Sequence, residues 1–241
     1  MTLSVRTGRL VVLVTWSAFL TWLYVEGEVA RYLGPRTSWV VPFGAVVLTG
    51  ATIAYGRLGA RSSDASRPLG RGEAAGLVWL LLPALIGFAM ADAALGSLAA
   101  SKKLTSRGID VSRLADSLSK DASRSSVLAL NIADHDDDFA VEKDLLPGRP
   151  ITLDGFVLKA AHREGGSFEM ARLYITCCVA DSIPLTARVE PVVPVPSFGR
   201  DDWVRVTGTL ARRDGDLIVR ADRVRGEPRP RHPYLTYRGA T

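Results

Sequence analysis

The sequence predicts a membrane protein with three transmembrane helices followed by a small all-β domain, an OB-like barrel of the oligonucleotide/oligosaccharide-binding type. Two observations predict this fold class. The first hundred residues contain three uncharged apolar runs, at Leu10–Val25, Thr37–Gly56 and Ala74–Ala91. From Pro150 onward, apolar and polar residues alternate in short runs that are separated by turn residues. A small β-sandwich is the alternative fold for this second part.

The three apolar runs have the length and the flanks of membrane spans. At about 1.5 Å per residue, each run is close to the length that crosses a hydrocarbon layer about 30 Å thick. Charged residues lie between the runs, and several tryptophans lie near their ends, as in an interfacial belt. A buried helix of a soluble core and a secretory signal are alternatives for the first run. The sequence Val25–Glu28 is a poor cleavage site, which favours a retained span.

The arginines of the short connecting segments predict the orientation of the spans. Positive charge is concentrated on the cytoplasmic side of membrane proteins. If the N-terminus is cytoplasmic, the short inner segments carry more arginines than the outer loop. The inner ones are Arg6, Arg9, Arg57, Arg61, Arg67 and Arg71, and the outer ones are Arg31 and Arg36. This predicts a cytoplasmic N-terminus and an extracytoplasmic C-terminal domain, although Lys102, Lys103 and Arg107 would then lie outside.

The composition divides the chain into three parts. Residues 1–101 form the membrane region, 102–148 a polar linker with one short helix at Val111–Leu118, and 149–241 the barrel. The net charge is +5, and arginine is scattered through both halves of the chain. We therefore expect this charge to serve solubility and lipid headgroup contact rather than nucleic-acid binding.

Five alternating runs predict the strands of the barrel. They are Ile151–Val157, Arg172–Val179, Pro184–Val189, Trp203–Leu210 and Leu217–Val224. Glycines within the runs, Gly155 and Gly208, would allow strands to bend where a small barrel turns its corners.

Cys177 and Cys178 are the only cysteines of the chain and lie in the second predicted strand. Adjacent residues of a regular strand point to opposite faces, which predicts Cys177 on the core face and Cys178 on the other. Three interpretations remain open. The cysteines are purely structural, or they bind a soft or borderline divalent metal ion such as zinc, or they take part in thiol–disulfide exchange. The further ligand of a metal site would be Asp181 or a histidine from elsewhere in the chain.

The acidic run Asp134–Asp138 is a second candidate metal site, with His135 and Asp136 as ligands. An exposed polar loop explains the run equally well, and it lacks the ligand spacing of a calcium loop. Asp92, near the end of the third apolar run, is an ionisable group close to membrane depth and therefore a third candidate.

Two other function classes have little support in the sequence. A nucleic-acid-binding barrel needs a basic groove with stacking aromatic residues, and the aromatic residues of the second half are few. The sequence contains no Ser-His-Asp pattern, phosphate-binding glycine loop or spaced carboxylate pair that would indicate an enzyme. We therefore expect neither catalysis nor a nucleic-acid partner.

Several stretches carry a resemblance to a known family. Tyr32–Arg36, Arg172–Asp181, Trp203–Gly208 and Pro230–Leu235 resemble, in this order, the YcgQ-like family of uncharacterised bacterial membrane proteins. The resemblance implies a partner of a larger multi-span permease, with a link to metal handling. The chain has Ser182 after Asp181, where the family more often has alanine.

The predicted function is that of a membrane-anchored accessory subunit. Three spans without an internal repeat are too few for a transporter, so a multi-span permease would supply the transport pathway. The extracytoplasmic barrel would contact the permease or its cargo. The alternative is a membrane-tethered OB-type module that binds another ligand, with purely structural cysteines.

Overall fold

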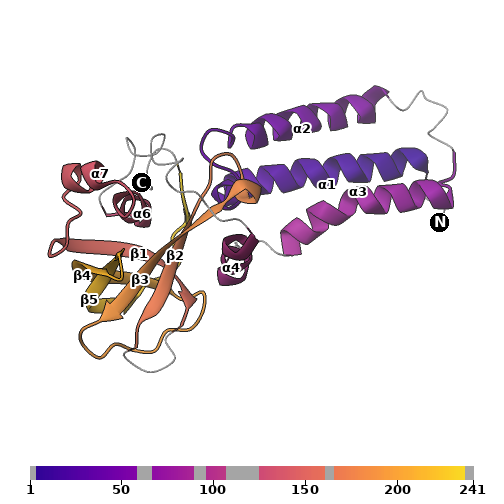
Figure 1. Cartoon of the computed structure of the whole chain (residues 1–241). Coiled ribbons are helices and arrows are strands. Elements are labelled where there is room, and N and C mark those ends of the chain that lie inside the picture. Colours follow the sequence, from indigo (N-terminus) through magenta and orange to yellow (C-terminus); the bar gives the residue numbers. More distant parts are fainter. Residues whose placement is uncertain (1–3, 59–66, 90–95, 107–124, 161–165, 237–241) are drawn as a thin grey trace. The chain divides into compact units, whose positions relative to one another are not determined.

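The chain forms two compact units, residues 1–94 and residues 95–241. The computed structural model describes residues 4–58, 67–89, 96–106, 125–160 and 166–236 (Figure 1). Long apolar helices make up the first unit, and a β-barrel with short helices makes up the second. The predicted fold class is therefore confirmed. Asp92 and the helix expected at Val111–Leu118 lie outside the described residues.

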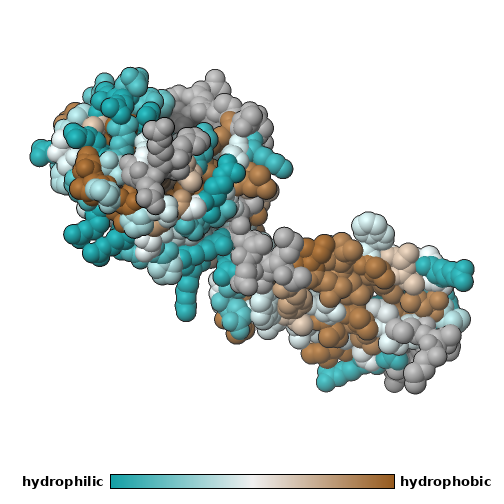
Figure 2. Space-filling view, turned by 90° about the horizontal axis from the view of Figure 1, so that it is seen from below, coloured by the Kyte–Doolittle hydropathy of each residue, from teal (hydrophilic) through white to brown (hydrophobic). Residues whose placement is uncertain are grey.

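The first unit contains three helices that are long and apolar enough to cross a membrane. They are α1 (Val5–Val25), α2 (Val40–Leu58) and α3 (Arg71–Ala89), and a short 3-10 helix, η1 (Glu28–Arg31), follows α1. Only 17%, 11% and 6% of their most apolar windows are buried. Figure 2 shows the resulting hydrophobic surface over these helices. Exposure of so much apolar surface to water is energetically unfavourable, so these helix faces fit a lipid environment.

The helix α1 packs against both α2 and α3. Two glycines permit close approach, since a Cβ on Gly8 would lie 2.5 Å from Leu77 and a Cβ on Gly87 would lie 2.7 Å from Phe19. Hydroxyl groups add a polar contact, because the Oγ of Ser17 lies 2.6 Å from a hydroxyl on α2. Small residues and interhelical hydrogen bonds are the usual means of helix association in lipid.

The second unit is built on a closed five-stranded barrel. Its strands are β1 (Pro150–Lys159), β2 (Phe168–Tyr174), β3 (Ile183–Pro191), β4 (Trp203–Arg213) and β5 (Asp216–Gly226), and a short β6 (Tyr234–Leu235) runs parallel to β2. The strands pair in the order β1-β2-β3-β5-β4, and β4 pairs with β1. Only the β3–β5 pair within the barrel is parallel. One sheet that closes on itself has the order of an OB fold, and the alternative sandwich is wrong.

Two glycines sit where the barrel leaves no room for a side chain. A Cβ on Gly155 would lie 2.6 Å from the carbonyl oxygen of Ala171, and a Cβ on Gly208 would overlap the carbonyl oxygen of Arg220. The β4–β5 register shifts between Thr207 and Gly208, which is an irregularity of the β-bulge type. Both glycines therefore serve close strand packing, and the corner role expected of them stays a prediction.

Two helices before the barrel, α6 (Val127–Ala133) and α7 (Asp137–Glu142), belong to its structure (Figure 1). Residues of α6 are buried in the same core as the barrel interior. The Asn131 side chain donates to the carbonyl of Thr186 on β3, and an oxygen of Asp134 accepts from the amide of Leu217 on β5, at 2.8 and 2.7 Å. Because β3 and β5 pair only near Val189–Pro191, α6 supplies polar partners where these strands do not meet. This part of the expected linker 102–148 is thus packed into the barrel.

A further helix, α4 (Ser97–Ser106), packs on β1, β2 and β3. Its Ala100 joins a second buried cluster with Phe156, Leu173 and Ile175. The carboxylate of Asp201, in the β3–β4 connection, accepts from the backbone amide and the hydroxyl of Ser97 at the start of the helix. The strands β1 and β2 are therefore covered on both faces.

The second strand differs from its prediction. The sequence predicted a strand at Arg172–Val179, whereas β2 covers Phe168–Tyr174 and the chain then leaves the sheet. Double-sided burial explains the missed start, because residues 168–171 contribute to two cores and show no clean alternation. The strand ends early because the carboxylate of Asp181 binds the amides of Thr176 and Cys177. The cysteines consequently lie beyond the strand rather than within it.

Candidate functional site

A tight turn after β2 carries the two cysteines. Asp181 organises it, because its Oδ1 accepts from the amide of Thr176 at 3.1 Å and its Oδ2 from the amide of Cys177 at 2.7 Å. The chain then forms a 3-10 turn, η5 (Val179–Asp181), in which the amide of Asp181 donates to the carbonyl of Cys178. The side chains no longer alternate between two faces of a sheet.

The turn brings three potential metal ligands together. The sulfur atoms of Cys177 and Cys178 and a carboxylate oxygen of Asp181 all lie within 4.8 Å of one another. Cys177 is exposed, and the other two residues are half-buried. The predicted burial of Cys177 in the core is wrong, since the turn directs it to solvent. Both cysteines are thiols rather than a disulfide. In a regular strand, their side chains would point to opposite faces and could not bind one ion together, but in this turn they lie close to each other.

Lys103 of α4 fixes the far side of the turn. Its Nζ donates to the carbonyl oxygens of Val179, Ala180 and Ser182 at 3.3, 3.0 and 3.0 Å, and contacts the Ser182 hydroxyl at 2.6 Å. Ser182 is buried. An ammonium group bound to several carbonyl oxygens holds the backbone of the turn in place. The sequence does not predict a role for Lys103 at this turn, because no local pattern connects it to residues 179–182, which lie 76 to 79 positions further along the chain.

The carboxylate and the thiol of this turn influence each other's protonation. Hydrogen bonds to Asp181 and to Cys178 are the main causes that raise the pKa of Cys177 to about 11. Burial opposes ionisation of Asp181, but hydrogen bonds from the Cys177 side chain and from backbone amides together hold its pKa below the ordinary value. In the metal-free turn, the ionised carboxylate of Asp181 therefore accepts a hydrogen bond from the protonated thiol of Cys177.

This donor set suits a borderline or soft divalent ion. Zinc binds cysteine sulfur at about 2.3 Å and carboxylate oxygen at about 2.0–2.2 Å, most often in tetrahedral geometry. Ligands at such distances lie about 3.3–3.8 Å apart, so the three side chains need only small rotations from their present separation. The described residues provide no second group of three such side chains within reach of one ion.

The acidic run serves a structural purpose in the described structure. Asp136 caps α7, because its Oδ1 accepts from the amide of Phe139 at 2.9 Å. The Nδ1 of His135 lies 3.1 Å from the carbonyl oxygen of Asn131, one helical turn earlier. The structure does not bring His135 and Asp136 to the cysteine turn, and the run forms the junction between two helices.

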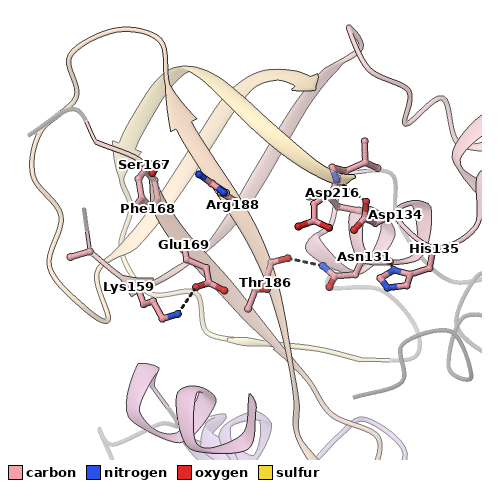
Figure 3. A pocket seen from close by; sticks show the side chains of 13 residues that line it. Asn131, Asp134, His135, Lys159, Ser167, Phe168, Glu169, Thr186, Arg188 and Asp216 are labelled. Atoms are coloured by element: carbon pink, nitrogen blue, oxygen red, sulfur yellow. Dashed lines mark hydrogen bonds and ion pairs between the residues drawn. The ribbon is translucent and has the colours of Figure 1, made fainter. Parts of the chain in front are cut away.

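His135 instead lines a groove of about 540 Å³ between α6 and the barrel (Figure 3). Asp134 and Asp216 lie near it, and Lys159 and Arg188 come from β1 and β3. In OB folds, the surface of β2 and β3 with the adjoining loops is the usual ligand-binding face. The groove is therefore a second candidate site, with both signs of charge.

A buried cation lies elsewhere on β2. Arg172 is 3% exposed, its guanidinium carbon lies 5.0 Å from the centre of the Trp203 ring, and its Nη1 lies 3.6 Å from a carboxylate oxygen of Asp154. Burial lowers its pKa, and Asp154 opposes this shift. This contact joins β1, β2 and β4, and it gives Arg172 a structural role.

Comparison with known families finds a match to part of the second unit. Residues 131–236 match the family model described as the DUF1980 C-terminal domain. The match begins in α6 and ends just after β6, so it covers the barrel and the cysteine turn. No curated protein matches the chain. The barrel unit is thus similar to an uncharacterised family.

Proposed function

We propose that the protein is a membrane-anchored accessory subunit of a multi-span permease, and that its barrel binds a divalent metal ion such as zinc. The observation that carries the metal-binding part is the cluster of Cys177, Cys178 and Asp181 on an exposed turn. Thiolate and carboxylate ligands at this separation favour zinc over magnesium or calcium, which prefer oxygen ligands alone.

The anchor supports an accessory role rather than transport by this chain alone. The charged residues of its three candidate spans lie near the helix ends and not in the apolar centres. They are Arg6 and Arg9 in α1, Arg57 in α2, and Arg71 and Glu73 in α3. Ion pathways in membranes normally carry ionisable side chains inside a helix bundle. A partner would therefore supply the transport pathway, in agreement with the resemblance to permease-associated proteins. The proposed role of this chain is binding rather than catalysis.

The proposed topology places the N-terminus in the cytoplasm and the barrel on the extracytoplasmic side. The arginine distribution between the spans supports it. Reporter fusions at residue 58 and at the C-terminus test it, because the proposal requires a cytoplasmic signal from the first and an extracytoplasmic signal from the second.

A second candidate function rests on the groove beside α6. It would make the protein a membrane-tethered binding module for another ligand, with cysteines of purely structural importance. The volume and the mixed charge of the groove favour a small polar ligand over an extended apolar one. Metal-binding measurements separate the two functions.

The decisive experiment measures zinc bound to the full chain in detergent micelles. We expect about one equivalent in the parent protein and loss of binding in the Cys177→Ser, Cys178→Ser double variant. The variant His135→Gln, Asp136→Asn is the matched control and should keep the ion. Zinc retained by the cysteine variant would refute the metal site. Co-purification of a multi-span protein from native membranes tests the permease partnership separately.

A further inference from the structure

The cysteine turn offers three ligands, whereas a closed zinc site has four. Structural zinc sites are usually four-coordinate, and sites with three protein ligands keep one position for water or an incoming group. Within the described residues, no fourth His, Cys, Asp or Glu joins the cluster. Cys177 is exposed, so the open side of the cluster faces solvent.

We infer that the turn is a metal hand-over site, which holds a zinc ion and passes it to an incoming donor by ligand exchange. The inference rests on the proposed metal-binding function. The acceptor's thiolate, imidazole or carboxylate would enter the fourth position, and the turn's ligands would leave in succession. No oxidation or reduction takes place, and the protons lost on loading return to the ligands on release.

The turn is organised without the metal, which makes such exchange possible. The carboxylate of Asp181 already binds the amides of Thr176 and Cys177, and Lys103 already binds the carbonyl oxygens on the other side. Each carboxylate oxygen has two lone pairs, so an oxygen that accepts an amide keeps one for an ion. The ion therefore need not order the backbone on arrival and does not unfold it on departure, unlike the ion of a zinc finger.

Lys103 also balances the charge of the loaded turn. Two thiolates and one carboxylate carry three negative charges, a zinc ion leaves one of them uncompensated, and the ammonium of Lys103 neutralises that one. The lysine bonds to carbonyl oxygens of residues 179, 180 and 182 and is therefore adjacent to the site without being a ligand. We assign Lys103 as the positioning residue of the hand-over site.

Chelator challenge of the zinc-loaded full chain in micelles tests the inference. With an open site, the rate of zinc transfer to EDTA should rise in proportion to the EDTA concentration, because the chelator attacks the bound ion. A rate that stays constant as EDTA increases would show a closed site and overturn the inference while leaving zinc binding intact. Absence of bound zinc before the challenge would instead overturn the proposed function.

Two variants test the role of the lysine. Lys103→Met should lower zinc affinity about 10- to 100-fold, the usual effect of losing a partner that orients the ligands. Lys102→Met, the neighbouring residue, is the matched control and should keep the parent affinity. The cobalt-loaded variant should keep the two-thiolate charge-transfer spectrum, since Lys103 is not a ligand. Loss of one thiolate band, or equal effects of both variants, would contradict the assignment.

Hydrogen exchange tests the pre-organised turn directly. The amides of Thr176 and Cys177 should be protected from exchange in the metal-free protein, with little further gain on zinc loading. Protection that appears only with zinc would show that the metal orders the turn, and the hand-over inference would then fail.

Discussion

Replacement of Asp181 should make the thiol of Cys177 more reactive. Hydrogen bonding to this carboxylate is the largest cause that holds the pKa of Cys177 at about 11, above the ordinary value of 9.0. A thiol is neutral below its pKa, so the raised value keeps Cys177 protonated at neutral pH. The thiolate is the reactive form. We therefore expect slow alkylation of the metal-free parent and faster alkylation of Asp181→Asn.

The size of the effect follows from the ionised fraction and the nucleophilicity. At pH 8, a thiol with a pKa of about 11 is about 0.1% ionised, and one with the ordinary value of 9.0 is about 9% ionised. The thiolate of higher pKa is intrinsically more nucleophilic, which offsets about 6- to 10-fold of this difference for a pKa change of two. The net increase in rate is therefore at most about 9- to 14-fold, reached if the loss of the carboxylate restores the ordinary pKa of Cys177 in full.

The assay measures iodoacetamide modification of the metal-free full chain in a Cys178→Ser background, by mass spectrometry. In this background Cys177 is the single thiol, and adding Asp181→Asn changes only the carboxylate. The rate of the parent should still rise with pH beyond 9, whereas that of the variant should level off earlier. Asp222→Asn, on the exposed part of β5, is the control. Equal rates and equal pH midpoints with and without the Asp181 carboxylate would refute the reasoning.

Three further predictions concern the fold. Gly208→Ala should prevent the barrel from folding, because its Cβ would overlap a β5 carbonyl, whereas Gly226→Ala meets its nearest atom at 3.6 Å and should fold, as circular dichroism can show. Asn131→Ala should destabilise the barrel by about 1 kcal/mol, seen as faster hydrogen exchange in β3, because the half-buried carbonyl of Thr186 loses its donor. Removing the Ser17–Thr49 hydroxyl pair should cost only about 0.6 kcal/mol in detergent unfolding, and a loss of several kcal/mol would contradict a minor role.

The membrane spans and the barrel strands could be predicted from the sequence because each lies in an environment that imposes its own local pattern of apolar residues. Lipid requires an uninterrupted apolar run, and its ends were predicted within a few residues, as Thr37–Gly56 against Val40–Leu58 shows. A barrel wall with one buried face alternates with period two, and β4 at Trp203–Arg213 began at its predicted residue.

The cysteine turn was not accessible in the same way. The run Arg172–Val179 has strand-like composition, and nothing local marks Tyr174 as the last residue of β2. The strand ends because the carboxylate of Asp181 accepts hydrogen bonds from the amides of Thr176 and Cys177, which therefore do not pair with a neighbouring strand. The alternation of apolar and polar residues carries no information about such a side-chain contact.

The contribution of α4 depends on contacts that are distant in sequence. Lys103 binds carbonyl groups that lie 76 to 79 residues further along the chain, and Asp201 binds the start of the helix from 104 residues away. Both contacts hold a helix of modest apolar character, whose only buried apolar residue in the described part is Ala100. Hydrophobic burial alone would fix such a helix weakly. The polar contacts at its two ends therefore fix it on the barrel, and the same contact at Lys103 holds the backbone of the candidate metal site.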